Sequence, residues 1–573
     1  MTSPPGPPPA SRLAASVPAI SWLPRYDRAW LRPDILAAVT VWAVVVPQAI
    51  AYAQIAGLPP GAGLFAAAAG LIGYGLLGTS KQIIVSPTSS TAAVSASIVA
   101  AVAAGNVDRF GVLSAALGLL AGVAFLTMGW AKLGFVARFI PHAVHVGFMF
   151  GLGLTIIVGQ TAKILGIPGT SGTFGEQLRQ LTASVAATGI NPAAIVIGVG
   201  ALAALLIGRR VAPALPVAIV VVAVGILAVA LLGLDARGVA VVGPVEGGWP
   251  LPAIPLVSAQ ELLVLVPGAI ALSIVAYAES LSVAQQLADE HGEEIHPDQE
   301  LIGNGGANVL AGLFGGFVVG GGASQSAANN QAGGRTQVVS FIVAGLTVLT
   351  SVALLPLFAD LPQPVLGAIV ITGVVGFLKI VEMRRIRSLR GDAFVGALVA
   401  LGATLILGIL PGLIASVILA LLTLLVRIAK PSMSVMGRLA DRRNWVALER
   451  APEARVEPGL LVLRLDAPLL FLNAGLMREE LRSALSAADQ PVTVVVLDLA
   501  MSSDLDIESL DTLVRLAEHA SQVGTELWLA EVRGPVRDMF DRAGIDTAIG
   551  PPRVFRSMSD AMAAFEARSS GRR

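Results

Sequence analysis

Long apolar stretches, each near the length of a membrane-spanning helix, follow one another from about residue 35 to about residue 430. Clear examples are residues 35–56, 193–207, 217–232 and 262–278. A helix needs roughly 20 apolar residues to cross the hydrocarbon core of a bilayer. Breaks at Gly, Pro and charged clusters divide the region into about 14 segments. The pattern predicts a polytopic α-helical membrane protein.

The pattern changes after Lys430, where apolar runs become short and charged residues become frequent. Residues 460–465, 492–499 and 527–532 are typical of strands, and helices are expected over 510–523 and 557–567. Alternating strands and helices over about 110 residues are typical of a small α/β domain. We therefore expect a soluble domain at the carboxyl end of the chain.

The domain boundaries follow from these changes in pattern. Residues 1–34 are rich in Pro and Ser and lack the apolar segment of a signal peptide, which predicts a disordered cytoplasmic leader. The transmembrane domain is expected over 35–430, a linker over 431–455 and the soluble domain over 456–573. With the amino terminus inside, most loop Lys and Arg residues fall on the inner side, which places both termini in the cytoplasm of a multi-pass inner or plasma membrane protein.

Composition supports the membrane assignment and excludes several chemistries. Of 573 residues, 55% are hydrophobic and only 13% are charged, with a mean hydropathy of +0.78. The absence of cysteine excludes a thiolate nucleophile, a disulfide framework and a cysteine metal site. His142 and His145 have no third ligand nearby and are interpreted as interfacial packing. Nucleotide, hydrolase and zinc-protease motifs are missing, so we expect no enzyme, cofactor, metal or nucleic-acid partner.

Two polar segments interrupt the apolar pattern in matching ways. Residues 86–91 (SPTSST) and 320–331 (GGGASQSAANNQ) place Gly, Pro and hydroxyl side chains where a membrane helix would continue. Each follows, by about 40 residues, a helix with polar groups: Gln48 and Tyr52 in one, Glu279 in the other. Irregular backbone at membrane depth is tolerated where it lines a cavity or is buried in protein. Paired interruptions of this kind point to a midplane binding site between inverted repeats.

The two interruptions offer the chemistry of an anion site. A helix that begins near the bilayer centre presents free N–H groups and the positive end of its dipole. Side chains that can donate hydrogen bonds lie at or near these helix starts: Gln48, Tyr52, Ser86, Thr88, Ser89, Ser324 and Ser326. Any one of these polar residues could instead serve helix packing. The paired clusters together favour an anion site.

Glu279 is a carboxylate within an otherwise apolar span. Ionisable residues in such positions are costly and usually functional. It could take up a proton, bind a cation, or hold two helices together by hydrogen bonds. A functional carboxylate would repel the substrate anion unless neutralised, which would couple transport to H⁺ or Na⁺.

Several motifs resemble those of the SulP anion transporters, the sulfate permease family that also includes prestin and pendrin. Residues 47–64 (PQAIAYAQIAGLPPGAGL) look like the first-helix signature of that family. Residues 277–280 (YAES) and 298–308 (DQELIGNGGAN) are similar to its eighth- and ninth-helix signature, and 320–336 to its tenth. The carboxy-terminal domain resembles a STAS domain through 494–510 (VVVLDLAMSSDLDIESL).

The resemblance implies a fold of seven plus seven inverted transmembrane segments, divided into a core and a gate domain, usually in a homodimer. It also implies an anion held between residues 86–91 and the start of the tenth segment, with Gln48 and Tyr52 contributing from the first helix. That start comprises Ala323, Ser324, Gln325 and Ser326. Transport would proceed by an elevator-like movement of the core against the gate.

Three positions depart from the family pattern. Gln325 stands where many members carry Arg, so the site would depend on helix dipoles and polar donors. Gln48 stands where some bacterial relatives have Glu, which leaves Glu279 as the coupling carboxylate. Ile507 follows Asp506 where phosphorylatable STAS relatives have Ser or Thr, so phosphorylation at that position is not expected.

The leading hypothesis is a secondary active transporter of an inorganic anion in the lipid bilayer, coupled to H⁺ or Na⁺. Sulfate is the first candidate substrate, followed by bicarbonate and a dicarboxylate. Because Gln325 provides no fixed charge, a monovalent substrate such as bicarbonate or chloride is also compatible with the sequence. A chloride-type channel or exchanger is the main alternative, and a regulatory membrane scaffold that signals through the STAS domain ranks last.

Overall fold

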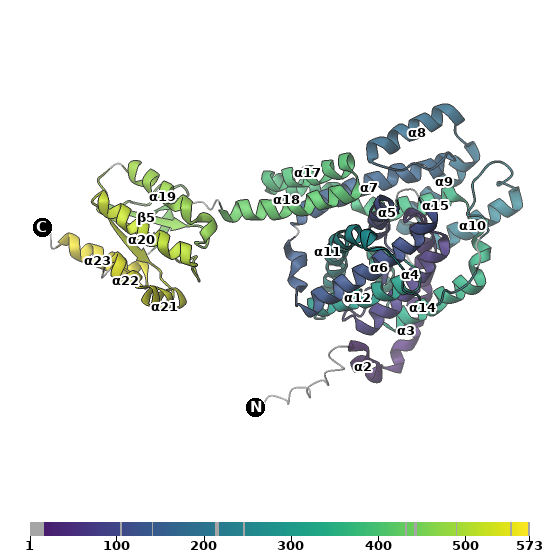
Figure 1. Cartoon of the computed structure of the whole chain (residues 1–573), viewed down its shortest axis with the longest axis horizontal. Helices are drawn as coiled ribbons and strands as arrows, with labels where there is room; N and C mark the ends of the chain where they lie inside the picture. Colours follow the sequence, from purple (N-terminus) through teal and green to yellow (C-terminus); the bar gives the residue numbers. More distant parts are fainter. Residues whose placement is uncertain are drawn as a thin grey trace. The chain divides into compact units, whose positions relative to one another are not determined.

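The computed structural model describes residues 17–103, 106–139, 141–211, 217–244, 247–429, 433–439, 444–488, 490–550 and 553–570. The chain divides into two compact units, residues 1–420 and 421–573 (Figure 1). Each unit is described by itself.

The first unit is built from helices that match the apolar stretches of the sequence. Its helices are α2 (Pro18–Trp22), α3 (Leu31–Ile55), α4 (Pro60–Leu77), α5 (Ser89–Ala103), α6 (Val107–Trp130), α7 (His142–Leu165), α8 (Phe174–Thr188), α9 (Pro192–Val211), α10 (Val217–Leu232), α11 (Ala259–His291), α12 (Pro297–Leu313), α13 (Ala323–Gln331), α14 (Val338–Leu349), α15 (Gln363–Val374), α16 (Ile380–Leu389), α17 (Gly391–Leu407) and α18 (Ile409–Ala429), which runs into the second unit. Within the described residues, eight helices are long and apolar enough to span a membrane, and four more apolar helices are shorter. The polytopic helical fold is confirmed, while the number of 14 crossings stays a prediction.

The helices pack in two groups. Helices α3, α4, α5, α6, α11, α12, α13 and α14 contact one another, and we call them the core helices. Helices α7, α9, α10, α15 and α17 form the second group, the gate helices. Helix α3 also packs against α15 and α10, so it lies where the two groups meet. Figure 1 shows α4, α6, α11 and α12 gathered within this unit.

Two short strands replace helix at the predicted interruptions. Strand β1 (Val85–Ser86) pairs antiparallel with β2 (Gly320–Gly321), so that Val85 faces Gly321 and Ser86 faces Gly320. Helix α5 begins three residues after β1, and α13 begins two residues after β2. The two interruptions, more than 230 residues apart in the sequence, therefore come together at one ladder between the starts of two half-helices.

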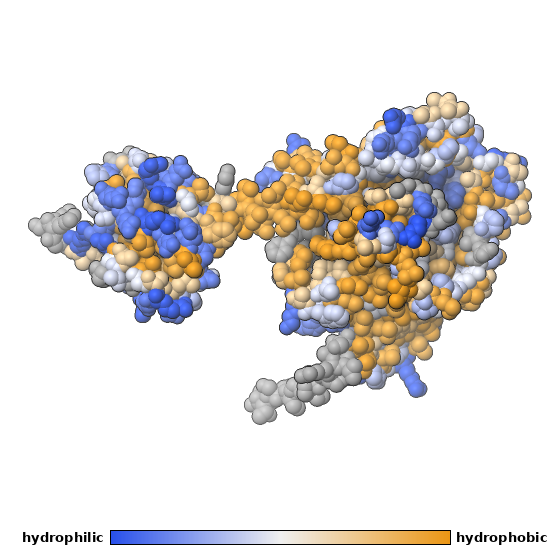
Figure 2. Space-filling model, in the orientation of Figure 1, coloured by the Kyte–Doolittle hydropathy of each residue, from blue (hydrophilic) through white to orange (hydrophobic). Residues whose placement is uncertain are grey.

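The second unit contains a five-stranded sheet in the order β4-β3-β5-β6-β7. The strands are β3 (Met433–Arg438), β4 (Trp445–Ala447), β5 (Leu460–Leu465), β6 (Val494–Asp498) and β7 (Glu526–Ala530), and the helices are α19 (Phe471–Ser486), α20 (Ile507–Gln522), α21 (Gly534–Ala543), α22 (Ile545–Ile549) and α23 (Met558–Ser570). Strands β5, β6 and β7 are parallel, and β3 is antiparallel to β4 and β5. Helices α19, α20 and α21 cover one face of the sheet, and α23 covers the other. In Figure 2 more of this unit's visible surface is hydrophilic than that of the helical unit, as expected for a soluble α/β domain.

Two predicted boundaries need correction. Residues 1–16 of the predicted leader lie outside the described residues, but Pro18–Trp22 is helical and α3 already begins at Leu31. Asp34 explains the ordered start of α3, because its carboxylate accepts hydrogen bonds from the Arg335 amide and the Thr336 hydroxyl at 2.7 Å each. The predicted linker 431–455 supplies strands β3 and β4, so its described part belongs to the sheet. The β-branched pattern was too short there to separate strand from linker.

Candidate functional site

The start of α13 is uncapped by any side chain and lies partly open. Gly322 occupies the N-cap position, and no side chain in the described part of the chain caps the first turn by a hydrogen bond. Ala323 is exposed and Ser324 is half-buried, although both follow the buried strand β2. The first N–H groups of a helix have no partner within the helix, so this end presents donors and the positive end of the helix dipole. These are the features predicted for an anion-binding helix start.

The start of α5 has the opposite character. Residues 82–90 are all buried. The Thr91 backbone amide donates to the Thr88 hydroxyl, and the Thr88 amide donates to the Thr91 hydroxyl, both at 3.2 Å. The Thr88 hydroxyl also lies 2.9 Å from that of Ser90. This reciprocal arrangement is a helix cap, so the first turn of α5 is closed by its own side chains.

Gln48 of α3 connects the first helix to α13. The Gln325 side-chain amide donates to the Gln48 carbonyl oxygen at 2.8 Å and to the Pro87 backbone oxygen at 3.2 Å. The Ser324 hydroxyl lies 3.4 Å from the Gln48 amide nitrogen. Three predicted ligands from two distant parts of the sequence, Gln48 and the adjacent Ser324 and Gln325, therefore meet at the open helix start.

Gln325 also lies over the beginning of its own helix. A Cβ atom added to Gly322 would fall 1.3 Å from the Gln325 side-chain oxygen. That oxygen is buried and has no hydrogen-bond partner among the described residues, and the same is true of the Ser86 hydroxyl on β1. Buried polar atoms without partners are uncommon in native proteins. Two such atoms lie near the start of α13, where they are available to a bound polar group.

The remaining predicted ligands differ in their surroundings. Tyr52 lies one turn after Gln48 on α3, at the i, i+4 spacing that places two side chains on one face, and it is buried. A Cβ added to Gly373 of α15 would lie 2.8 Å from its hydroxyl, so Tyr52 faces the gate. Ser89 is buried at the first position of α5. The Ser326 hydroxyl accepts the Ile84 amide at 2.9 Å, a contact that supports the ladder rather than the opening.

Glu279 and its neighbour connect α11 to both half-helices. The Ser90 hydroxyl donates to the half-buried Glu279 carboxylate at 2.7 Å. The next residue, Ser280, accepts the Gly321 amide of β2 at 2.7 Å. Among the described residues no ion pair engages Glu279, although Lys379 is near enough to interact with it electrostatically. The carboxylate is thus joined to the α5 cap but not neutralised by a bound cationic side chain.

Sequence reasoning missed Ser90 and Ser280. Both lie within segments that were singled out, but nothing in a run of small polar residues indicates which hydroxyl faces a carboxylate. Helical spacing could have favoured Ser90, since α5 begins at Ser89 and each residue turns by about 100°. The pairing of Ser280 with β2 depends on a contact across 41 residues, which no local pattern reveals.

Side chains also satisfy the irregular backbone next to the site. Asn308 pairs with the backbone of Val319 at 2.9 and 3.0 Å, while Gln337 donates to the carbonyls of Ser80 and Ile83. Asn329 donates to the carbonyl of Gln82 at 2.8 Å. Unpaired backbone groups at membrane depth cost several kcal/mol each. These buried amides keep the two interruptions in one defined arrangement.

The described residues contain no cluster of three or more His, Cys, Asp or Glu side chains that could hold a metal ion. His142 is exposed and lies 3.2 Å from Glu382, whereas His145 of α7 is half-buried.

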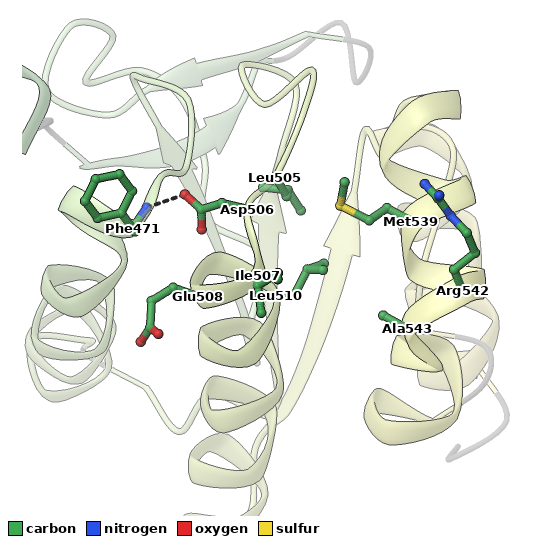
Figure 3. Close-up of a pocket in the computed structure, with 9 residues that line it drawn as sticks. All are labelled: Phe471, Leu505, Asp506, Ile507, Glu508, Leu510, Met539, Arg542 and Ala543. Carbon is green, nitrogen blue, oxygen red and sulfur yellow. Dashed lines mark hydrogen bonds between the residues drawn. The ribbon is translucent and has the colours of Figure 1, made fainter.

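A hollow lies in the carboxy-terminal unit. Its volume is about 620 Å³, and Figure 3 shows it between the starts of α19 and α20 and the helix α21. The Asp506 carboxylate caps α20 by accepting the Ser509 amide at 2.8 Å and accepts the Phe471 amide at 2.7 Å. Burial raises the pKa of Asp506, but these hydrogen bonds outweigh it and hold the pKa below its usual value. Ile507, 78% exposed, occupies the following position and offers no hydroxyl for phosphorylation.

Comparison with known proteins places these features in a family context. The sulfate permease family matches residues 31–401, and the STAS domain matches residues 451–561. The chain is 36% identical over 563 residues to a probable sulfate transporter of Mycobacterium tuberculosis (strain ATCC 25618 / H37Rv), covering 98% of this chain and 100% of that protein. It is 25% identical over 576 residues to high affinity sulfate transporter 2 of Stylosanthes hamata, covering 96% and 86%.

Two solved structures have a similar fold. The murine Solute Carrier 26 family member A9 anion transporter, in its inward-facing state, superposes with a TM-score of 0.88 at 22% identity, covering 97% of this chain and 94% of that one. The transmembrane domain of a cyanobacterium bicarbonate transporter gives 0.60 at 23% identity, covering 69% and 98%. The predicted polytopic helical membrane fold with a carboxy-terminal STAS domain is confirmed, while the seven-plus-seven segment count stays a prediction.

Proposed function

Because the chain belongs to the sulfate permease family, we propose that this multi-pass membrane transporter carries sulfate by secondary active transport coupled to H⁺ or Na⁺. The family is one of anion transporters and not of enzymes. Sulfate is favoured because relatives from bacteria and plants are described as sulfate transporters. We also propose that both termini are cytoplasmic and that the protein works as a homodimer.

The observation that carries the proposal is the uncapped start of α13, with Gln48, Ser324 and Gln325 beside it. An anion bound there would accept hydrogen bonds from the first backbone amides of α13 and from these side chains. Preorganised donors of this kind stabilise negative charge without a formal cation. Ser86 and Tyr52 would complete the ligand set from β1 and α3.

Glu279 is proposed as the coupling group. Its carboxylate joins the α5 cap through Ser90 and has no ion-pair partner among the described residues. When ionised it would oppose an anion near the two half-helices, and a bound H⁺ or Na⁺ would remove that repulsion. The core helices would then move against the gate helices with both ions in place.

Bicarbonate is a second candidate because Gln325 supplies no fixed positive charge. A monovalent anion needs less compensation than sulfate when it is held by neutral donors. The fold is also shared with the transmembrane domain of a bicarbonate transporter.

The test is uptake of radiolabelled sulfate or bicarbonate into liposomes that contain the purified protein, with and without an inward H⁺ or Na⁺ gradient. We expect saturable sulfate uptake driven by one of these gradients and lost in Ser324→Trp, whose ring would fill the open helix start. Bicarbonate flux without sulfate uptake would show that bicarbonate, not sulfate, is the substrate. Ohmic currents that do not depend on the cation gradient would show that the protein is a channel and not a carrier.

A further inference from the structure

Lys163 is a basic side chain at the boundary between gate and core. It lies in the last turn of α7, and its ammonium donates to the Gln54 side-chain oxygen of α3 at 2.7 Å. No carboxylate pairs with it in any of the ion pairs found among the described residues. About one turn earlier on α7, Gln160 buries a side-chain oxygen that has no hydrogen-bond partner among the residues the structure describes. An ammonium group at the end of a helix that lacks a counter-ion among the described residues can attract a mobile anion.

Two helices give the distance between Lys163 and the proposed anion site. On α3, Gln48 precedes Gln54 by six residues, or about 9 Å of helix rise. On α15, the Tyr52 hydroxyl lies against Gly373, whereas a Cβ at Gly367 would lie 3.4 Å from that of Lys163. These glycines are also six residues apart, again about 9 Å. Both measures place Lys163 about 1.7 helical turns beyond the site, toward the carboxyl end of α3.

The direction of this offset matters for an elevator movement. If the core helices move along α3 toward its carboxyl end by about 9 Å, Gln54 leaves Lys163. The Tyr52 hydroxyl then passes from the level of Gly373 to that of Gly367, which brings the anion site beside the ammonium. With the amino terminus in the cytoplasm, this movement carries the site toward the external face.

We propose that Lys163 completes the anion site in the opposite conformation, by supplying from the gate the positive charge that Gln325 does not supply from the core. This inference rests on the proposed elevator transport. In the present conformation Gln54 holds the ammonium in place of the anion. The site is therefore neutral on one side of the membrane and cationic on the other, which gives sulfate a higher affinity at the external face.

The test measures the KM for sulfate separately at each face, in vesicles of known orientation. Lys163→Met is expected to raise the external KM by about ten-fold, the size of a lost charge-assisted contact, and to leave the internal KM within two-fold. Lys163→Arg keeps the charge and is expected to retain most of the external affinity. Gln54→Leu removes the hydrogen bond but not the charge, so it is the matched control and is expected to leave both KM values within about two-fold.

Equal KM changes at the two faces in Lys163→Met, or the same external change in Gln54→Leu, would overturn the proposal and leave Lys163 with a packing role. Wild-type protein that transports no anion would instead contradict the proposed function, so the two failures are distinct.

Because the chain has no cysteine, the movement can be tested independently with Gln54→Cys combined with Lys163→Cys. A short thiol crosslinker between them is expected to stop transport, while each single variant treated in the same way stays active. Full transport by the crosslinked pair would show that these helices do not separate and would also overturn the proposal.

Discussion

The two half-helices meet at one ladder but begin in different ways. Thr88 and Thr91 cap the buried start of α5, whereas Gly322 leaves the start of α13 uncapped and partly exposed. The carboxylate of Glu279 connects to the capped side, and the amide of Gln325 lies over the open side. Two half-helices that meet at one ladder can therefore differ in the chemistry they offer. In the proposed mechanism, anion binding belongs mainly to α13 and cation coupling to α5.

The open start of α13 can be closed by one methyl group. In Gly322→Ala the new Cβ would take the place of the Gln325 side-chain oxygen and displace a flexible side chain rather than backbone. We expect sulfate uptake to fall by roughly ten-fold or more, with a melting temperature close to wild type. Gly345→Ala is the control, since a Cβ there meets nothing within 4 Å. Unchanged uptake in Gly322→Ala would contradict the assignment to α13.

The capped start of α5 is tested through its carboxylate. Glu279→Gln keeps the shape but cannot lose or gain a proton or charge, so uptake should lose its dependence on the cation gradient while anion exchange persists. Ser90→Ala removes the hydrogen bond to Glu279 and is expected to weaken the dependence only in part. Ser95→Ala removes another buried hydroxyl of the same helix, one that has no hydrogen-bond partner within the described parts of the chain, and should behave as wild type. Intact gradient dependence in Glu279→Gln would remove coupling from this residue.

A fixed positive charge at the start of α13 tests whether the anion contacts the side chain at position 325. Gln325→Arg retains donors that can reach Gln48 and adds a positive charge at the start of α13. We expect the preference for sulfate over bicarbonate to rise by about five-fold, the effect of roughly 1 kcal/mol from a charged donor. Competition uptake measures it directly. The same ratio in Gln325→Arg and wild type would show that the anion does not contact this side chain.

The smallest expected effect is a loss of stability when the N-terminal cap of α20, in the carboxy-terminal unit, is removed. Asp506→Ala removes the α20 cap and should lower stability by about 1 kcal/mol, seen as faster hydrogen exchange at the start of α20 in the full chain. Because the folded-state pKa of Asp506 is lowered, the cap stabilises fully above the unfolded pKa of about 3.9 and loses its effect as the pH falls through the folded value. Asp511→Ala, an exposed position on the same helix, is the control, and equal exchange in both variants would exclude the capping role.

Much of the fold follows from patterns that depend on nearby residues. The apolar runs predicted α10 at its observed bounds, and the strand pattern did the same for β5. Strands β3 and β4 were missed because their residues have mixed polarity and pair only through contacts with β5 and each other. Helix α19 was missed because its charged sequence has only a weak apolar face.

The sequence predicted which residues form the site but not which hydrogen-bond partners they have. Gln48, Ser324 and Gln325 were expected near one another, and the structure brings them together. The sequence could not indicate that Thr88 would be used within a cap, or that Lys163 would reach Gln54 across 109 residues. Such contacts depend on how helices are rotated against each other, and similar small side chains leave that rotation undetermined.

The two-residue ladder between β1 and β2 bears on whether one ion can cross the membrane without the other. Since β1 precedes α5 and β2 precedes α13, the ladder fastens the proposed cation and anion positions to a single body, reinforced by the Ile84 contacts with Gly322 and Ser326. Neither half-helix can then swing open without breaking buried hydrogen bonds. A protein built this way would have difficulty letting one ion slip through alone, and the fidelity of its stoichiometry would depend on four paired backbone residues.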